Sequence, residues 1–286
     1  MGITHKMDNP LLLPSGFLIV DKPFGWTSFD CVNKIAWTMK NSLGLKKKPK
    51  VGHAGTLDPH ATGVLVVAVG KATKSLEQLK GADKDYVAEI GFGVKSETYD
   101  LDGEVEFIED IILNPSNTSL SKFLTEVNVE KILSEFRGEI DQMPPKFSAL
   151  KVGGKRAYDL ARAGKEFELK PRKVVIEKLE FMDSGIKEVS AAPSLVKVPF
   201  IKVFATVSKG TYMRSLARDI GEILGAPAAL IGLRRTRVGQ ATLGGVIKLN
   251  SDMNSSLDGC GRVVKLSKET SFEQLKAGLI GVSELI

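Results

Sequence analysis

Segments typical of strands and of helices follow one another along this chain without regular alternation. Two long strand-like runs, RKVVIEKLEF at 172–181 and VKVPFIKVFATV at 196–207, come in succession and precede an amphipathic helix over 210–225. An earlier run, YVAEIGFGV at 86–94, leads through an Asp-Gly turn to a returning strand, which is typical of an antiparallel hairpin. This mixture predicts an α+β fold with a mixed, largely antiparallel central sheet flanked by helices.

The first seventy residues predict a strand, a capped helix and a second strand. GFLIVDKP at 16–23 is a short apolar run ended by a proline, which indicates a buried strand. Thr27 and Asp30 form a capping-box-like helix start, and Gly44 is placed to end that helix. VLVVAVG at 64–70 is continuously apolar, which is typical of an interior strand.

Composition narrows the class of protein. The chain has 286 residues, of which 43% are hydrophobic, and its net charge is +6, which fits a polyanionic partner as well as a basic cytosolic enzyme. Its two cysteines, Cys31 and Cys260, have no metal-ligand spacing, so no metal site is expected. The longest apolar run is far shorter than the ~20 residues that cross a bilayer, and the start is a poor signal peptide. We therefore expect a cytoplasmic protein without a membrane segment.

A lone carboxylate, Asp58, lies within the glycine-rich and aliphatic stretch VGHAGTLDPHATGVLVVAVG at 51–70. Pro59 should hold Asp58 in an extended conformation, and the surrounding glycines allow a ligand or backbone to come close. A carboxylate at the mouth of a buried strand can act as a nucleophile or general base. It can equally be a turn aspartate that binds its own backbone. The glycine spacing does not match a phosphate-binding P-loop.

The same stretch carries a family resemblance. GHAGTLDPHATGVLVVAVGKATK at 52–74 resembles the catalytic motif of the bacterial-type tRNA pseudouridine-55 synthases, the TruB family. Four further segments are similar, in family order, to its Lys-Pro motif, its tyrosine motif, its RNA-contacting segment and its arginine motif. These segments are FLIVDKPFGWTSFDCVNKI at 17–35, DKDYVAEIGFGVKSETYDLDGEV at 83–105, QMPPKFSALKVGGKRAYDLARAG at 142–164 and SKGTYMRSLARDIG at 208–221.

The resemblance implies a fold, a reaction and a substrate. It implies the pseudouridine synthase fold, with an active-site cleft across the sheet, and isomerisation of the T-loop uridine at tRNA position 55 without cofactor or metal. The partner is then the T-arm stem-loop of tRNA, which a monomer binds by flipping out the target base. Asp58 is implied as the essential carboxylate, either attacking the ribose or abstracting a proton from it. Arg214 is implied to pair with Asp58, and Tyr86 to stack on the uracil and assist proton transfer at the ring carbon.

Further positions gain supporting roles by the same resemblance. Lys22 is implied to brace the catalytic loop, His53 to hold the opened RNA loop, and Leu233 to pack against the target base. Lys151 and Arg156 belong to the basic clusters expected to contact RNA. Those clusters are KKKPK at 46–50, KVGGKR at 151–156, KPRK at 170–173 and LRRTR at 233–237. Without the resemblance, a surface arginine, a strand tyrosine and solvated charge clusters are the simpler interpretations.

The predicted domain organisation has three parts. Residues 1–15 are expected to form a flexible tail, and residues 16–250 the catalytic domain, with an RNA-contacting insertion at about 142–165. Residues 251–286 are expected to form a short extension without the complete PUA-like domain that bacterial relatives commonly carry. Two other functions remain possible from the sequence. One is a non-catalytic RNA-binding protein or tRNA folding chaperone, and the other is a phosphate or nucleotide hydrolase with Asp58 as its nucleophile.

Overall fold

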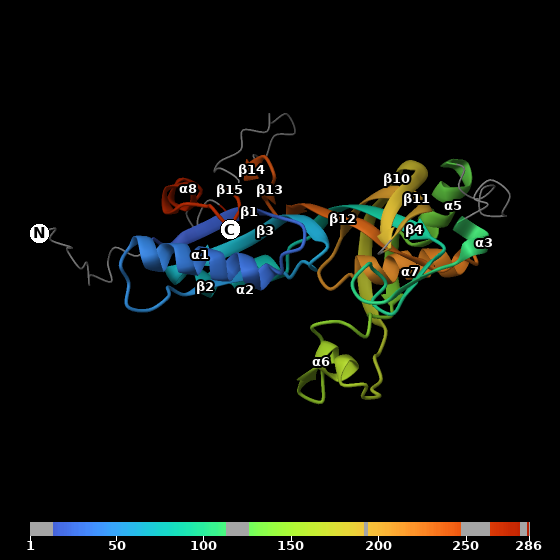
Figure 1. Cartoon of the computed structure of the whole chain (residues 1–286), viewed down its shortest axis with the longest axis horizontal. Coiled ribbons are helices and arrows are strands. Elements are labelled where there is room, and N and C mark those ends of the chain that lie inside the picture. Colours follow the sequence, from blue (N-terminus) through green and yellow to red (C-terminus); the bar gives the residue numbers. More distant parts are fainter. Residues whose placement is uncertain (1–13, 113–125, 192–193, 247–263, 281–284, 286) are drawn as a thin grey trace, which may run out of the picture. The chain divides into compact units, whose positions relative to one another are not determined.

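The computed structural model describes residues 14–112, 126–191, 194–246, 264–280 and 285 (Figure 1). The chain divides into two compact units, which we call unit 1 (residues 1–84 and 234–286) and unit 2 (residues 85–233). The boundary falls inside two strands, β4 (Lys84–Phe92) and β12 (Ala228–Val238). The predicted N-terminal tail lies outside the described residues apart from Pro14 and Ser15.

The sheet of unit 1 is built on a central antiparallel pair. Strand β1 (Gly16–Lys22) runs antiparallel to β3 (Ala61–Val69), with Lys22 opposite Gly63. Strand β2 (Val51–Ala54) is also antiparallel to β3, whereas β15 (Val264–Lys265) is parallel to β1. The last residues of β12 lie beside β3, and β13 (Ala241–Thr242) and β14 (Gly245–Val246) continue from β12.

Both faces of the β1–β3 pair are buried. One face packs against α2 (Leu76–Lys80), which follows a 3-10 turn over Gly70–Ser75, and the other packs against α1 (Ser28–Ser42). The first face carries Phe17, Ile19, Val64, Val66 and Ala68, and the second carries Leu18, Val20, Leu65, Val67 and Val69. Strands covered on both sides have continuously apolar sequences, so the predicted interior strands are confirmed.

Helix α1 begins and ends as its sequence predicts. Thr27 Oγ1 accepts a hydrogen bond from the Asp30 amide at 3.0 Å, and the Thr27 amide donates to Asp30 Oδ2 at 2.9 Å. This reciprocal pair is a capping box. Gly44 follows the helix with φ +62°, the left-handed conformation that favours glycine.

The described C-terminal residues build part of the core of unit 1. The sequence SFEQLKAGLIGVSELI at 271–286 predicts a short capped helix. Helix α8 (Phe272–Ala277) confirms it, because the helix starts with a capping box between Ser271 and Gln274. Its Leu275 is fully buried against the α1 face of the sheet. Ile280 exchanges two backbone hydrogen bonds with Phe17 of β1, each at 2.8 Å.

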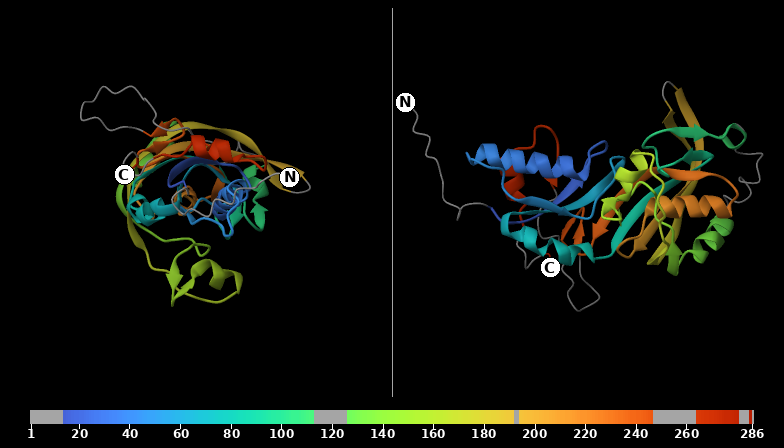
Figure 2. Two further views of the ribbon diagram at one scale, coloured as in Figure 1. Left: turned by 90° about the vertical axis from the view of Figure 1, so that its left-hand side faces the viewer. Right: turned by 90° about the horizontal axis from the view of Figure 1, so that it is seen from below.

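Unit 2 contains the strand order β12–β4–β11–β10–β7. Strand β10 (Arg172–Ala191) is antiparallel to both β11 (Ser194–Val207) and β7 (Gly138–Gln142). Helix α5 (Glu126–Glu135) packs on β10, and α7 (Met213–Ile223) lies next to α5 (Figure 2). The predicted α+β class, with a mixed and largely antiparallel sheet, is therefore confirmed.

Smaller elements of unit 2 confirm some local predictions and correct another. The expected hairpin is formed by β5 (Val94–Ser96) and β6 (Val105–Phe107), with Gly103 at φ +100° in its turn. The sequence NVEKILSEFRG at 128–138 predicts a helix capped by Asn128. This cap is wrong, because α5 already begins at Glu126. The remaining elements are α3 (Glu109–Ile112), β8 (Lys151–Val152), β9 (Lys155–Arg156) and α6 (Ala157–Arg162).

None of the described helices has the length and apolar character needed to cross a membrane. The described residues also contain no group of three or more His, Cys, Asp or Glu side chains placed to hold a metal ion.

Candidate active site

Asp58 lies in the connection between β2 and β3, and backbone hydrogen bonds anchor the residues on both sides of it. Ser28 Oγ accepts a hydrogen bond from the Leu57 amide at 2.8 Å and donates to the Leu57 carbonyl at 3.0 Å. The Pro59 carbonyl accepts a hydrogen bond from the Gly25 amide at 2.9 Å. Asp58 itself is half-buried, while Leu57 is only 3% exposed. The carboxylate therefore projects from a loop whose backbone is fixed.

Lys22 connects that loop to the turn after β1. Its side chain is fully buried, and Nζ donates to the carbonyls of Trp26 at 2.6 Å, Pro23 at 3.0 Å and Pro59 at 3.1 Å. Burial lowers the pKa of Lys22 to about 8, although the charges of Cys31 and Asp58 act in the opposite direction. Lys22 is thus placed to hold two loops together.

Arg235 holds the first half of the Asp58 loop, and the sequence analysis did not identify this role. The residue is 1% exposed, and its guanidinium donates to the carbonyls of Val64 at 2.7 Å, Gly55 at 3.1 Å and Thr56 at 3.4 Å. The expectation that Arg235 contacts RNA as part of the 233–237 cluster is therefore wrong. Its backbone also passes so close to Gly63 that a Cβ there would lie 2.1 Å from the Arg235 carbonyl oxygen.

The other members of the 233–237 cluster also make contacts within the protein. Arg234 donates to Asp21 Oδ2 at 2.9 Å and to Thr62 Oγ1 at 3.1 Å, and Arg237 donates to the Gly239 carbonyl at 3.1 Å. Leu233, the last residue of unit 2 in β12, is half-buried.

His53 lies in β2, opposite Val67 of β3. Burial lowers its pKa, and the nearby Arg235 cation lowers it further, so the neutral imidazole is favoured. Its Nδ1 atom is buried and has no hydrogen-bond partner among the described residues. The pairing of β2 with β3 and the nearby Arg235 cation place His53 near the Asp58 loop, and its contact with RNA stays a prediction.

Arg214 lies in the first turn of α7 in unit 2 and is 7% exposed. Its Nη1 donates to the Thr98 carbonyl and its Nη2 to the Phe147 carbonyl, each at 3.0 Å. Its Nε lies 3.6 Å from Oδ2 of Asp100, whose side chain is also buried. Because Arg214 and Asp58 belong to different units, their pairing stays a prediction.

Asp100 is the second residue that the sequence analysis missed. It is the last residue of the TYD sequence in the segment similar to the tyrosine motif. In that segment the sequence predicted only the hairpin turn at the following Asp-Gly pair. Asp100 Oδ1 accepts hydrogen bonds from Thr98 Oγ1 at 2.5 Å and from the Asp102 amide at 2.9 Å. A buried carboxylate held by these donors can orient the guanidinium of Arg214.

The start of the predicted RNA-contacting insertion is attached to α7. Gln142, which is 2% exposed, accepts a hydrogen bond from the Tyr212 amide at 2.8 Å and donates to the Tyr212 carbonyl at 3.1 Å. The Met143 carbonyl accepts from Ser215 Oγ at 2.7 Å and from Arg218 Nη2 at 3.1 Å. The helix that carries Arg214 therefore also fixes the first residues of the insertion.

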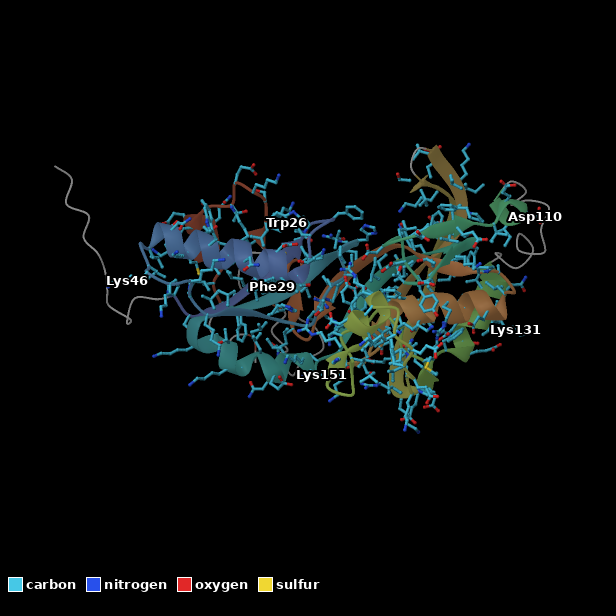
Figure 3. The ribbon with its side chains drawn as sticks, turned by 60° about the horizontal axis from the view of Figure 1, so that its bottom comes forward. Trp26, Phe29, Lys46, Asp110, Lys131 and Lys151 are labelled. Atoms are coloured by element: carbon cyan, nitrogen blue, oxygen red, sulfur yellow. The ribbon has the colours of Figure 1, made fainter. Side chains whose placement is uncertain are left out.

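The insertion presents basic side chains on a small hairpin. Lys151 of β8, labelled in Figure 3, is opposite Arg156 of β9. Both residues are exposed. The turn between them contains Gly153 and Gly154, both in the left-handed region. Exposed cations on such a hairpin can reach phosphates.

Tyr86 lies on the buried face of β4 and is 8% exposed. Its alternating neighbours Lys84, Ala88 and Ile90 are buried as well. The structure thus places Tyr86 in unit 2 with Arg214, and its stacking on a uracil stays a prediction.

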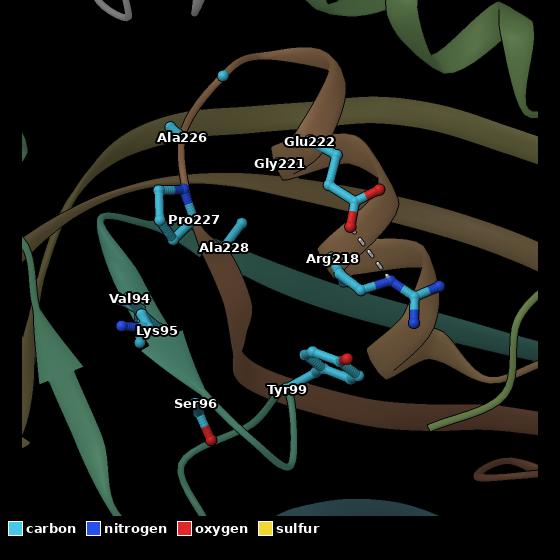
Figure 4. Close-up of a pocket in the computed structure, with 11 residues that line it drawn as sticks. Val94, Lys95, Ser96, Tyr99, Arg218, Gly221, Glu222, Ala226, Pro227 and Ala228 are labelled. Atoms are coloured by element: carbon cyan, nitrogen blue, oxygen red, sulfur yellow. Dashed lines mark ion pairs between the residues drawn. The ribbon is translucent and has the colours of Figure 1, made fainter. Parts of the chain in front are cut away.

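Unit 2 also has a pocket of about 400 Å³ beside α7 (Figure 4). Tyr99, Arg218 and Glu222 contribute to its wall, and the Arg218 guanidinium lies 5.0 Å from the centre of the Tyr99 ring. Arg218 Nε lies 3.8 Å from Glu222 Oε1. None of the described residues that line this pocket is a predicted site residue, so the pocket does not define the candidate active site.

Comparison with known proteins identifies the family. The sequence model described as "TruB family pseudouridylate synthase (N terminal domain)" matches residues 40–213. Two relatives are called tRNA pseudouridine synthase B. The one from Parabacteroides distasonis is 44% identical over 226 residues, which are 79% of this chain and 86% of the relative. The one from Bacteroides fragilis is 46% identical over 226 residues, which are 79% of this chain and 87% of the relative.

A solved structure has a fold similar to that of this chain. A chain in the crystal structure of a Cbf5–Nop10–Gar1 complex is 30% identical to this protein, with a TM-score of 0.50. The match covers 79% of this chain and 50% of that one, so the present chain spans about half of its length. Together with the family match and the two bacterial relatives, these findings show that the chain belongs to the TruB family of pseudouridylate synthases.

Proposed function

We propose that this protein converts the T-loop uridine at position 55 of tRNA to pseudouridine. The observation that carries this proposal is the match to bacterial tRNA pseudouridine synthases at 44% and 46% identity over most of both chains. The anchored Asp58 loop supports it, because hydrogen bonds fix the backbone on both sides of this carboxylate, within the segment similar to the family's catalytic motif.

The reaction moves one bond and one proton. The bond between C1′ of the ribose and N1 of uracil breaks, the base turns, and a bond forms between C1′ and C5. The proton on C5 is lost and N1 gains one, so substrate and product have the same composition. Asp58 starts the reaction, either by attacking the ribose or by abstracting a proton from it.

Arg214 and Asp100 serve Asp58 in this proposal. The Arg214 guanidinium has a different partner at each nitrogen: Asp100 at Nε, the Thr98 carbonyl at Nη1 and the Phe147 carbonyl at Nη2. These three partners orient it. We propose that Arg214 pairs with Asp58 when RNA excludes water from that carboxylate. Asp100 is a positioning residue, because it acts through Arg214.

Other residues contact the substrate in this proposal. Tyr86 stacks on the flipped uracil and assists removal of the C5 proton, Leu233 packs against the same base, and His53 holds the opened RNA loop. Lys151 and Arg156 contact backbone phosphates of the T-arm stem-loop. We propose that the protein acts in the cytoplasm as a monomer, which binds one tRNA at a time.

The direct test uses an unmodified tRNA transcript with tritium on C5 of its uridines. The expected result is release of tritium from one uridine per tRNA, mapped to position 55, and no release when that uridine is replaced by cytidine. Asp58→Asn should lower turnover at least about ten-thousandfold and change the tRNA dissociation constant by less than about twofold. Tight binding without isomerisation by the unaltered protein would instead support a non-catalytic RNA-binding protein or a folding chaperone.

A further inference from the structure

Phe24 and His60 form an exposed aromatic pair next to the candidate catalytic residue. Their ring centres lie 5.0 Å apart and their planes differ by 11°, so the rings stack. Phe24 is 66% exposed, and His60 follows Asp58 by two positions in the chain. Since one face of the Phe24 ring lies against the imidazole and two-thirds of the residue is exposed, the other face is open to solvent.

The hydrogen bonds that anchor the Asp58 loop also hold this stack. Phe24 belongs to the turn between β1 and α1, and Lys22 Nζ binds the carbonyls of Pro23 and Trp26 on either side of Phe24. The Gly25 amide and Lys22 Nζ both donate to the carbonyl of Pro59, the residue that links Asp58 to His60. The open face of Phe24 therefore keeps a fixed position relative to the Asp58 backbone.

An exposed phenylalanine does not by itself indicate a binding site, because single apolar side chains are common on protein surfaces. Phe29, which Figure 3 labels on α1, is 63% exposed and is not part of this stack. Phe24 differs in three respects. Its ring is stacked, hydrogen bonds hold its turn, and its stacking partner His60 lies two residues after Asp58, which is proposed to act on a nucleotide. This combination points to a ligand with a flat, apolar face.

Nucleobases in RNA loops present such faces. Unstacked bases bind to aromatic side chains in single-stranded RNA recognition. Extrusion of a target nucleotide removes a stacking partner from the base beside it. A fixed aromatic ring near the reacting carboxylate can replace that lost partner.

We propose that the open face of Phe24 stacks on a nucleobase that flanks the target uridine, with His60 supporting the ring from behind. This inference rests on the proposed function, because it takes the nucleotide at Asp58 to be the flipped uridine. It assigns a base-binding role to two residues outside the catalytic set.

The test measures binding of a T-arm hairpin in an Asp58→Asn background, so that no product forms. The hairpin is used intact and with an abasic site at each nucleotide flanking the target uridine. Phe24→Leu, which keeps apolar volume but lacks a flat face, should weaken binding of the intact hairpin between about fivefold and a hundredfold. Phe24→Trp should bind within about twofold of the parent. Thermal unfolding of each variant checks that the fold is retained.

The abasic hairpins identify the contact. At one flanking position, loss of the base should make Phe24→Leu and its parent bind alike, within about twofold. Phe29→Leu, the matched control on α1, should leave the affinity for every hairpin unchanged. The proposal is overturned if Phe24→Leu binds the intact hairpin with the affinity of its parent. It is also overturned if the substitution lowers the affinity for every abasic hairpin by the same factor.

Pseudouridine formation on the same hairpin by protein with an intact Asp58 separates the two proposals. If the uridine is isomerised but Phe24 shows no coupling to a flanking base, the stacking proposal is wrong and the proposed function stands. If coupling is present without isomerisation, the base-binding role stands and the proposed reaction is wrong.

Discussion

The Asp58 loop of unit 1 and the β8–β9 hairpin of unit 2 are built in opposite ways. Around Asp58, the three donors Lys22, Ser28 and Arg235 are at most 2% exposed, and each binds loop carbonyls. On the hairpin, Lys151 and Arg156 are exposed and project from two-residue strands. Buried donors fix the backbone that carries one carboxylate, whereas exposed cations suit phosphates whose positions vary.

Because the two regions are built differently, we expect the rate of reaction and the affinity for RNA to depend on different residues. Changes to the buried donors should lower stability or the rate of the bound complex, and they should leave the dissociation constant nearly unchanged. Changes to the hairpin should do the reverse.

Arg235→Met should lower the free energy of unfolding by about 2–4 kcal/mol, because the carbonyls of Gly55, Thr56 and Val64 lose a buried donor. Urea denaturation measures the effect. Arg156→Met, at an exposed position, serves as the control and should change stability by less than about 0.5 kcal/mol. Equal losses in the two variants would show that Arg235 does not hold the loop.

Lys22 should make stability rise with pH on the alkaline side. Its pKa is lowered to about 8 in the folded protein, so below that pH the buried cation is destabilising in full. Between pH 8 and the ordinary lysine value, only the unfolded chain keeps the proton, and the free energy of unfolding should rise on the order of 2 kcal/mol. Lys22→Met should lack this rise.

The comparison of the unaltered protein with the Lys22→Met variant needs a common background. Burial raises the pKa of Cys31 to about 11, and loss of that proton from the unfolded chain would lower stability over the same pH range. Both proteins are therefore measured with Cys31→Ala. Parallel pH profiles with and without Lys22 would contradict the assignment of the lowered pKa to its ammonium group.

Arg214→Lys should slow the single-turnover rate at saturating RNA at least about tenfold, equal to about 1.4 kcal/mol. Lysine keeps the charge but loses the planar guanidinium that reaches Asp100, Thr98 and Phe147 together. Arg172→Lys, at an exposed position in β10, should leave the rate unchanged. A wild-type rate for Arg214→Lys would show that this geometry is not used.

Replacing Lys151 and Arg156 together by alanine should weaken tRNA binding about threefold to tenfold at moderate salt. The dependence of log K on log salt should become less steep by about 1–2. The rate at saturating RNA should stay the same, because neither residue belongs to the Asp58 loop. A lowered saturating rate would break the separation between the two regions.

The sequence predicted regular elements better than the buried polar contacts. Thr27, Asp30 and Gly44 define helix α1 by local chemistry, and the alternating faces of β1 and β3 are both apolar, so these elements could be predicted. Arg235 could not, because an arginine between other basic residues has the same sequence signature whether it binds carbonyls or phosphates. Its role depends on contacts with residues 171 to 180 positions away.

Asp100 shows the same limit in the candidate site. An Asp two residues before an Asp-Gly turn is typical of loops, and only the packing of α7 against that loop shows that it faces Arg214. Asn128 shows that a good cap residue can lie inside a helix when the preceding residues also join it. Local signals therefore predicted elements, whereas long-range contacts decided what individual charged residues do.

The most direct measurement of the central claim, that buried donors hold the Asp58 loop ready for reaction, uses Ser28. Ser28→Ala removes the hydroxyl that binds both the amide and the carbonyl of Leu57, and Thr38→Val removes a buried α1 hydroxyl that has no partner among the described residues. Single-turnover rates at saturating tRNA and dissociation constants are measured for both. We predict a rate at least about tenfold lower for Ser28→Ala, with a dissociation constant within about twofold of wild type, and no change for Thr38→Val. An unchanged rate for Ser28→Ala, or a loss found only in binding, would contradict the account.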